Sequence, residues 1–155
     1  MLNLDRHLLR SIRDYQRHAA RAGFLSKVRR RLARARHIFW SVVTSSDIDP
    51  NVTFGDGLKL PHPTGVVFHG KAVIGKNCMI MQQVTIGMIG DGEYPTLGNN
   101  VYVGAGAKII GKLHIGDGAR VGAGAVVLRD VPAGFTAVGN PARLVRKPPV
   151  VRPAA

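Results

Sequence analysis

One histidine in this 155-residue chain stands where it could act as a general base. His62 lies between two prolines, in the run Leu60-Pro61-His62-Pro63-Thr64-Gly65. A neutral imidazole can remove a proton from an attacking hydroxyl group, and a carboxylate on its other ring nitrogen fixes the tautomer and stabilises the imidazolium that forms. Asp47, fifteen positions earlier, is the candidate carboxylate. The alternatives are a turn role for His62 and a turn or helix-capping role for Asp47.

The segment that must position these residues repeats every six positions. Six residues keep the side chain on one side of a strand but rotate a helix well past a full turn. Short strands separated by Gly, Asn and Asp turns therefore predict a mainly β fold, a parallel β-solenoid, over residues 48–140. The repeated aliphatic positions are Ile74, Ile80, Ile86, Leu97, Val103, Ile109, Ile115, Val121 and Val127.

The period slips once. Ile86 and Leu97 are eleven positions apart rather than twelve, and residues 87–95 contain three glycines, an aspartate and a proline. This composition predicts a loop that leaves the solenoid. Loops that project from a rigid scaffold commonly carry function, and the alternative is a tolerated insertion.

The first 46 residues are the most basic part of the chain. They contain eleven Lys and Arg against two acids, and so hold most of the net charge of +13. Apolar residues at helical spacing predict two amphipathic helices that break near Gly23. We expect their apolar faces to pack on the main domain or on a neighbouring subunit, with contact to an anionic membrane surface as the alternative. We expect His7, His18 and His37 at the surface. The second apolar series is Leu25, Val28, Leu32, Ala35, Phe39 and Val42.

Composition excludes several classes of protein. A single cysteine, Cys78, rules out an intramolecular disulfide and favours a reducing cytoplasm, and its place in the repeat predicts a buried, inert thiol. No membrane span is expected, because no long window is free of charge, and residues 1–20 lack the layout of a signal peptide. No nucleic-acid-binding module accompanies the basic residues. Three prolines within residues 148–155 predict an extended or disordered tail.

The repeating segment, residues 47–147, resembles the hexapeptide-repeat acyltransferases, and within them the serine acetyltransferases. The resemblance implies a left-handed parallel β-helix preceded by a short α-helical segment. It also implies a homotrimer, alone or paired as a dimer of trimers through the basic helices. The matching text is Asp47-Ile48-Asp49-Pro50, residues 57–65, Gln83-Val84-Thr85-Ile86-Gly87, residues 104–111 and Val138-Gly139-Asn140-Pro141-Ala142-Arg143.

The resemblance also assigns roles to individual residues. The histidine that matches His62 is the general base, and the aspartate that matches Asp47 orients it. Acetyl-CoA, the co-substrate, is expected in a groove between subunits, and the alternative for its C-terminal arginines is a solvated basic tail. No metal is expected, since His69 and His114 lack the paired-histidine spacing of the related carbonic anhydrases. The positions that match the acetyl-CoA site are Ala105, Ala123, Leu128, Arg129, Arg143 and Arg146.

The acceptor is where the sequence departs from the serine acetyltransferases. Pro61 replaces their aspartate, and Glu93 and Tyr94 replace the arginine and histidine of their loop. A glutamate would repel a carboxylate at that place. We therefore expect an O-acetyltransferase whose acceptor is a hydroxyl of a sugar, such as a polysaccharide precursor, or of another small molecule. The alternatives are L-serine acetylation in cysteine biosynthesis, and a non-catalytic scaffold that binds an anionic membrane or partner through its basic helices.

Overall fold

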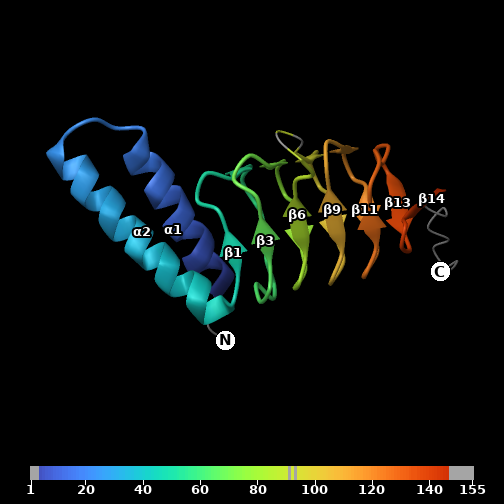
Figure 1. Ribbon diagram of the computed structural model, residues 1–155, viewed down its shortest axis with the longest axis horizontal. Helices are drawn as coiled ribbons and strands as arrows, with labels where there is room; N and C mark the ends of the chain where they lie inside the picture. The colour runs from blue at the N-terminus through green and yellow to red at the C-terminus, as the bar shows by residue number, and fades with distance from the viewer. Residues whose placement is uncertain (1–3, 91, 93, 147–155) are drawn as a thin grey trace, which may run out of the picture.

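The computed structural model describes residues 4–90, 92 and 94–146, which form a helical hairpin followed by a long β-solenoid (Figure 1). Helices α1 (Leu4–Ala19) and α2 (Phe24–Thr44) lie at one end. The strands that follow are β1 (Asp47–Ile48), β2 (Thr53–Phe54), β3 (Val67–Phe68), β4 (Val73–Ile74), β5 (Met79–Ile80), β6 (Thr85–Gly87), β7 (Thr96–Leu97), β8 (Tyr102–Val103), β9 (Lys108–Ile110), β10 (His114–Ile115), β11 (Arg120–Val121), β12 (Val126–Val127), β13 (Phe135–Val138) and β14 (Arg143–Arg146).

The strands form three sheets that make the sides of a prism. The first sheet has the order β1-β3-β6-β9-β12, the second β10-β7-β4-β2, and the third β14-β13-β11-β8-β5. Neighbouring strands are parallel and come from successive coils, as in the register Val67↔Thr85, except that β14 returns antiparallel to β13. The predicted parallel β-solenoid with a helical N-terminal segment is confirmed.

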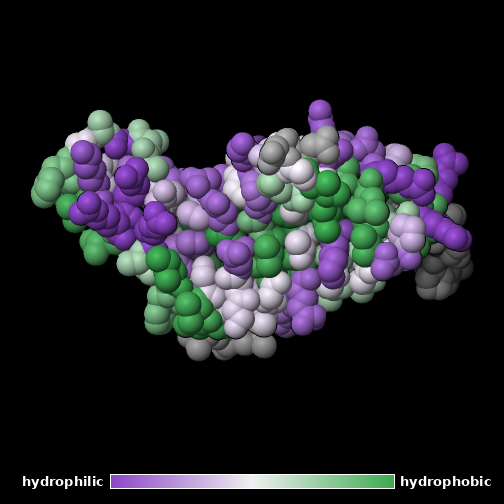
Figure 2. Space-filling view, in the orientation of Figure 1, coloured by the Kyte–Doolittle hydropathy of each residue, from purple (hydrophilic) through white to green (hydrophobic). Residues whose placement is uncertain are grey.

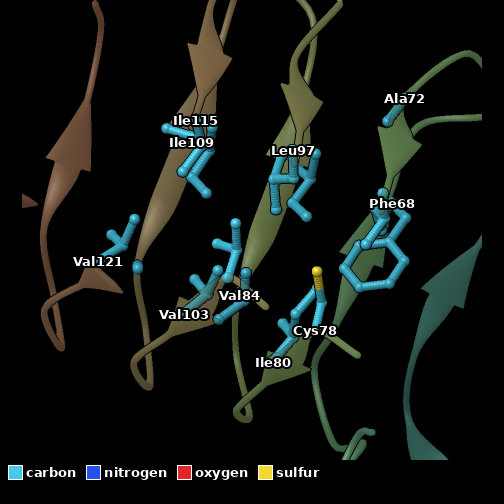
Figure 3. Packing of buried hydrophobic residues seen from close by; sticks show 14 of the residues in the cluster. Phe68, Ala72, Cys78, Ile80, Val84, Leu97, Val103, Ile109, Ile115 and Val121 are labelled. Atoms are coloured by element: carbon cyan, nitrogen blue, oxygen red, sulfur yellow. The ribbon is translucent and has the colours of Figure 1, made fainter. Parts of the chain in front are cut away.

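The six-residue period places one aliphatic side chain per strand inside the prism. Figure 3 shows residues from successive coils, such as Ile80, Val103 and Val121, stacked in rows toward the interior. The repeated positions from Ile74 to Val127 are at most 1% exposed. Close stacking of coils also restricts the corners: a Cβ on Gly104 would lie 2.5 Å from the backbone nitrogen of Ala123. A glycine is therefore needed where one coil approaches the next.

Helix α1 seals the N-terminal end of the core. Leu8 and Ile12 are fully buried and belong to the same hydrophobic cluster as the solenoid interior. Gln16 Nε2 donates to the carbonyl oxygens of Pro50 (2.9 Å) and Val52 (2.8 Å). Arg13 pairs with Asp56 at 3.0 Å. The prediction that the first apolar face packs on the main domain holds for the part of α1 that contains Leu8 and Ile12.

Helix α2 differs from the prediction. Its buried residues are Ser26, Ala33, His37 and Thr44, whereas the apolar series that begins at Leu25 points to solvent. Within one chain this series therefore does not pack on the main domain, and packing on a neighbouring subunit, the other branch of the expectation, stays a prediction. The physical reason is that the face opposite this series is the one that α1 and the first coil cover: Ser26 Oγ donates to His18 O of α1, and His37 contacts Ile48 O.

The surface placement expected for His37 is also wrong, because this side chain is 5% exposed between α2 and the first coil. Its Nε2 lies 2.8 Å from the carbonyl oxygen of Ile48, and its Nδ1 lies 3.3 Å from Ser11 Oγ. Burial lowers the pKa of His37. Cys78 is buried as predicted, and burial raises the pKa of its thiol.

None of the helices in the described part of the chain is long and apolar enough to cross a membrane. The predicted tail, residues 148–155, and Lys147 at the end of the repeating segment lie outside the described residues.

Candidate active site

The corner that carries His62 is larger than the same corner of the next coil. Eight positions separate Lys59 from Val67, whereas six separate Met79 from Thr85. The extra length falls on the Pro61–Gly65 run, where Leu60 and Pro63 are buried while His62 is exposed. The flanking buried residues fix the backbone on either side of the histidine. His62 is thus an exposed imidazole on an anchored turn.

Asp47 lies beside this corner. Its backbone N–H donates to the carbonyl oxygen of Val66 (2.8 Å), and the N–H of Gly65 donates to the carbonyl oxygen of Ser45 (2.9 Å). The start of β1 therefore runs along the end of the histidine turn. The side chain of Asp47 is exposed and lines a cavity of about 520 Å³ between α2 and the first coil. The structure contains no hydrogen bond between the Asp47 carboxylate and the His62 ring, both of which lie in the described part of the chain.

The His62 corner continues along the solenoid as a row of stacked turns. The N–H of Gln83 donates to Thr64 O, that of Gly106 to Gln82 O and that of Gly124 to Ala105 O, at 2.9, 2.9 and 2.8 Å. Gly65 (φ 69°) and Gln83 (φ 58°) share the left-handed conformation that these turns require. We call this row the histidine corner; it comprises residues 61–66, 82–84, 104–107 and 122–125.

One residue of the histidine corner was missed by reading the sequence. Gln82 has a buried side-chain oxygen, Oε1, without a hydrogen-bond partner among the described residues. A buried amide oxygen without a partner is costly, so such an atom commonly marks a place where a ligand or water binds. The signal available in the sequence was a pair of glutamines, Gln82-Gln83, at a corner where other coils have small residues.

The candidate acetyl-CoA residues gather toward the C-terminal end of the histidine corner. Ala105 and Ala123 occupy successive turns of it. Beyond them, the N–H of Ala142 donates to Val126 O at 2.8 Å, which brings the last segment against β12. A cavity of about 310 Å³ lies there, lined by Leu128, Arg129, Pro141, Ala142 and Arg143.

The arginines of this cavity differ in how they are held. Arg129 donates to the carbonyl oxygen of Ala142 at 3.4 Å, which holds its guanidinium at the cavity. Arg143 begins β14, and Arg146 ends it, opposite Phe135. Arg146 does not line the cavity. The structure thus brings Leu128, Arg129 and Arg143 together and leaves Arg146 apart from them.

The substrate-loop candidates do not all meet at the histidine corner. Pro61 adjoins His62 and is exposed. Tyr94 stacks on His69 with ring centroids 4.9 Å apart, and the Lys71 ammonium lies 5.0 Å from the Tyr94 ring centroid. These three residues lie where the first sheet turns into the second, one corner away from His62. Glu93 lies outside the described residues.

Within the described residues, no three His, Cys, Asp or Glu side chains converge as metal ligands would. His69 is engaged with Tyr94, and the backbone of His114 donates to Asp130 at 2.7 Å. The polar groups at the histidine corner are the imidazole of His62, the amide of Gln82 and backbone groups, with the carboxylate of Asp47 beside them. This set suits proton removal from a hydroxyl and hydrogen bonding to an acyl donor.

Comparisons with known proteins show the family to which this fold belongs. The family model described as "Bacterial transferase hexapeptide (six repeats)" matches residues 94–129. The serine acetyltransferase of Synechococcus elongatus is 46% identical over 107 residues, which are 67% of this chain and 44% of that protein. The serine acetyltransferase of Helicobacter pylori is 40% identical over 133 residues, which are 84% of this chain and 74% of that protein. The chain spans less than half the length of the Synechococcus relative.

Solved structures give the same relationship. Soybean serine acetyltransferase complexed with serine superimposes with a TM-score of 0.75 at 44% identity, covering 89% of this chain and 56% of that one. A serine acetyltransferase in complex with CoA gives a TM-score of 0.75 at 37% identity, covering 90% of this chain and 56% of that one. By its repeats, its coils and its relatives, the chain belongs to the serine acetyltransferase family of hexapeptide-repeat transferases.

Proposed function

We propose that this protein is an acetyl-CoA-dependent O-acetyltransferase that acts by general base catalysis at the histidine corner. The observation that carries the proposal is the enlarged, anchored turn that presents His62 on the same row as Ala105 and Ala123. An imidazole so placed can take the proton of an acceptor hydroxyl while the hydroxyl oxygen attacks the thioester carbonyl. The products are an acetyl ester and free CoA.

In this proposal Asp47 orients His62. The backbone bonds from Asp47 to Val66 and from Gly65 to Ser45 place the two residues on adjoining segments. Hydrogen bonds of catalytic groups are often incomplete before substrate binds, which is consistent with two exposed side chains that form no hydrogen bond with each other. Once formed, a carboxylate–imidazole bond would fix the tautomer and stabilise the imidazolium.

The acetyl-CoA site would run from the backbone of Ala105 and Ala123 to the cavity at Arg129 and Arg143. Guanidinium groups suit the phosphates of the adenosine end, because each offers paired N–H donors and a fixed charge. Leu128 would supply apolar contact. Arg146 belongs to the proposed set only as a more distant positive charge. A serine acetyltransferase solved in complex with CoA, at 37% identity, supports this part of the proposal.

We propose L-serine as the acceptor. The relatives from Synechococcus elongatus and Helicobacter pylori are both serine acetyltransferases, and a soybean relative has been solved with serine bound. These comparisons favour serine over the sugar or other small-molecule acceptor that Pro61, Glu93 and Tyr94 led us to expect. Repulsion of serine by Glu93 would require its carboxylate to lie beside the acceptor, and Glu93 lies outside the described residues.

A homotrimer is the assembly we propose. Tyr94 lies one corner away from His62, so a single chain does not bring this residue of the loop to the proposed base. In a trimer of prisms, a corner of one subunit can face a different corner of the next. Such an arrangement would complete each site with a loop from a neighbour.

The test is an acceptor panel with the purified full chain and acetyl-CoA, with release of free CoA as the readout. We expect turnover with L-serine that depends on His62, and little or none with nucleotide sugars. Turnover with a sugar but not with serine would contradict this proposal and favour the sugar acceptor expected from Pro61, Glu93 and Tyr94. Absence of CoA release with every acceptor, despite CoA binding, would favour the non-catalytic alternative.

A further inference from the structure

Helix α2 carries its large apolar side chains on the side that faces away from α1, and two of them, Ile38 and Val42, also line the cavity beside Asp47. The side packed on α1 is made of small or polar residues, among them Ser26, Ala33 and Thr44. By contrast, Phe24 and Val42 are 79% and 73% exposed. We call the exposed apolar face the outer stripe of α2; it comprises Phe24, Leu25, Val28, Leu32, Ile38, Phe39, Val42 and Val43.

The outer stripe lies at one extremity of the molecule. In Figure 1, the N-terminal part of α2 lies beyond α1 as seen from the solenoid, and the hairpin extends past the first coil. The C-terminal half of α2 reaches the first coil, where His37 contacts the carbonyl oxygen of Ile48. Figure 2 shows a strongly hydrophilic patch on the helical end, bordered by hydrophobic residues along its outer edge. Helix α2 has 21 residues and is therefore about 30 Å long. An exposed apolar face of this extent normally marks an interaction surface.

Within α2, every charged residue beside the outer stripe is a cation. The sequence of α2 contains no Asp or Glu. At about 3.6 residues per turn, Lys27, Arg31 and Arg34 lie along one edge of the stripe, and Arg29 and Arg36 along the other. Among these five, in the part of the chain that the structure describes, Arg36 alone forms an ion pair, with Asp14 of α1. At the C-terminal part of the helix, Asp47 and Asp49 of the first coil line a cavity together with Ile38 and Val42 of the stripe. Over residues 24–36 the stripe is thus an apolar band between two rows of positive charge.

We propose that the outer stripe of α2 binds the surface of an anionic lipid bilayer. The stripe spans about 100° or more of the helix, which is wider than the narrow seam of a coiled coil. Apolar side chains of an interfacial helix enter the boundary between headgroups and acyl chains, while long arginine stems reach back to the headgroups. Negatively charged headgroups would meet cations along both edges.

A second copy of the chain fits the stripe less well. Pairing two outer stripes, parallel or antiparallel, would bring Arg29 and Arg31 against the arginines of the other copy. Like charges that face each other across a helix pair are destabilising, and coiled coils normally carry both signs at these positions. An acidic helix of another protein would satisfy the charges, but a narrow seam would leave part of the stripe exposed. A bilayer covers its whole width.

The geometry also allows membrane contact and acetyl-CoA binding at the same time. The cavity at Arg129 and Arg143 lies by the last coil, next to β14, whereas α2 precedes the first coil. Figure 1 places α2 and β14 at opposite ends of the molecule. A bilayer on the outer stripe would therefore leave that cavity open. The cavity beside Asp47, by contrast, is partly lined by Ile38 and Val42 of the stripe, so a bound bilayer would lie next to it. The proposal does not depend on which acceptor is used.

Vesicle flotation of the full chain tests the proposal. Vesicles of phosphatidylglycerol and phosphatidylcholine in equal parts should carry the protein up the gradient, and pure phosphatidylcholine vesicles should not. Raising the salt concentration should release much of the bound protein, because it screens the headgroup charge. The double variant L32E/F39E should lose binding to the anionic vesicles while keeping its circular dichroism spectrum and its CoA affinity.

Two variants with the same change in net charge distinguish binding through the stripe from non-specific attraction by the positive charge of the whole protein. R31E/R34E alters the edge of the stripe, and K76E/K112E makes the same change in net charge on exposed solenoid residues. Each basic residue near an anionic surface contributes about a five-fold change in affinity, so R31E/R34E should weaken binding at least about ten-fold and K76E/K112E far less.

Three outcomes would overturn the proposal. The first is failure of the wild type to bind anionic vesicles. The second is equal loss in the two charge variants. The third is a lipid-free assembly of the wild type that L32E/F39E dissociates, since a second copy would then cover the stripe.

Discussion

The backbone N–H of Gly65 donates to the carbonyl oxygen of Ser45 across 2.9 Å, and so joins the turn that carries His62 to the residues that precede Asp47. The adjoining bond, from Asp47 N–H to Val66 O, is equally independent of side chains. The alignment of the proposed base and its carboxylate is therefore set by main-chain bonds. Substitution of either side chain should leave the alignment, and the fold, intact.

His62→Ala should abolish most of the acetyl transfer without weakening CoA binding. General base catalysis contributes about 10²–10⁴-fold to rate, so kcat should fall by that factor. CoA release measures turnover, and calorimetry with CoA checks the binding site. His114→Ala, a change of an exposed histidine on the second sheet, is the control and should retain wild-type kcat. Equal rates for His62→Ala and wild type would remove His62 from the mechanism.

Asp47→Asn should lower kcat by up to about 10⁴-fold, because an amide can hold the imidazole in the wrong tautomer and cannot stabilise its charged form. KM for acetyl-CoA should change little. Asp56→Asn provides a matched control: Asp56 is an exposed carboxylate that pairs with Arg13, away from the histidine corner. If Asp47→Asn kept full activity, the carboxylate would have no orienting role.

The repeating part of the fold could be predicted because its signal is local. Each hexad places an aliphatic residue inside and a turn residue at a corner. The position of Leu97 or Val103 in its own hexad is therefore enough to predict that the side chain is buried. The helical hairpin was harder. Its apolar periodicity correctly predicts helices, but periodicity does not say which face a neighbour covers, and α1 packs on the Ser26–Ala33 side of α2. His37 was misplaced for the same reason.

The candidate site was predictable only in part. His62 and Asp47 stand in motif-like runs, and their adjoining segments follow from the coil geometry. Gln82 carries no such pattern, because an unpartnered buried oxygen is a property of packing and not of residue type. The separation of Tyr94 from His62 could not be predicted either, since it depends on the corner from which the 87–95 loop leaves.

Gln82→Leu should raise KM for a substrate without destabilising the protein. The oxygen of Gln82 is buried without a partner, so an apolar side chain of similar size removes an unfavourable group from the free protein. If a substrate donates a hydrogen bond to this oxygen, its loss should cost about ten-fold in kcat/KM. Kinetics with acetyl-CoA and serine varied separately will show which substrate is affected. Unchanged kcat/KM for both substrates would mean that Oε1 of Gln82 binds an ordered water and not a substrate.

Arg129→Ala and Arg143→Ala should each raise KM for acetyl-CoA, since both guanidinium groups line the cavity at the end of the histidine corner. Loss of a charge-assisted hydrogen bond costs about ten-fold in affinity, and kcat should stay near wild type. The effect should shrink for acetyl-pantetheine, which lacks the adenosine phosphates. Arg146→Ala, at the other end of β14, should have a smaller effect. Equal effects with both acyl donors would place the arginines away from the phosphates.

His37 should make the free energy of unfolding depend on pH. Burial lowers the pKa of His37, and hydrogen bonding to Ile48 O with the nearby charges of Asp49 and Asp47 opposes this only in part. The unfolded chain retains the ordinary pKa of about 6.5, so below that pH it binds the proton more readily than the folded protein does. The contribution of neutral, buried His37 to the free energy of unfolding is therefore fully present above pH 6.5. It is lost progressively as the pH falls from 6.5 toward the lowered pKa of His37.

The variant His37→Gln isolates this contribution. A glutamine amide can still donate to Ile48 O but does not titrate, so the difference in unfolding free energy between wild type and variant should narrow from pH 7.5 to pH 5. Urea unfolding across that range measures it, and His114→Gln, at an exposed position, should follow the wild-type curve. Parallel curves for wild type and His37→Gln would mean that His37 accepts its proton in the folded protein as readily as in the unfolded chain, and the helix–solenoid junction would then be insensitive to acid.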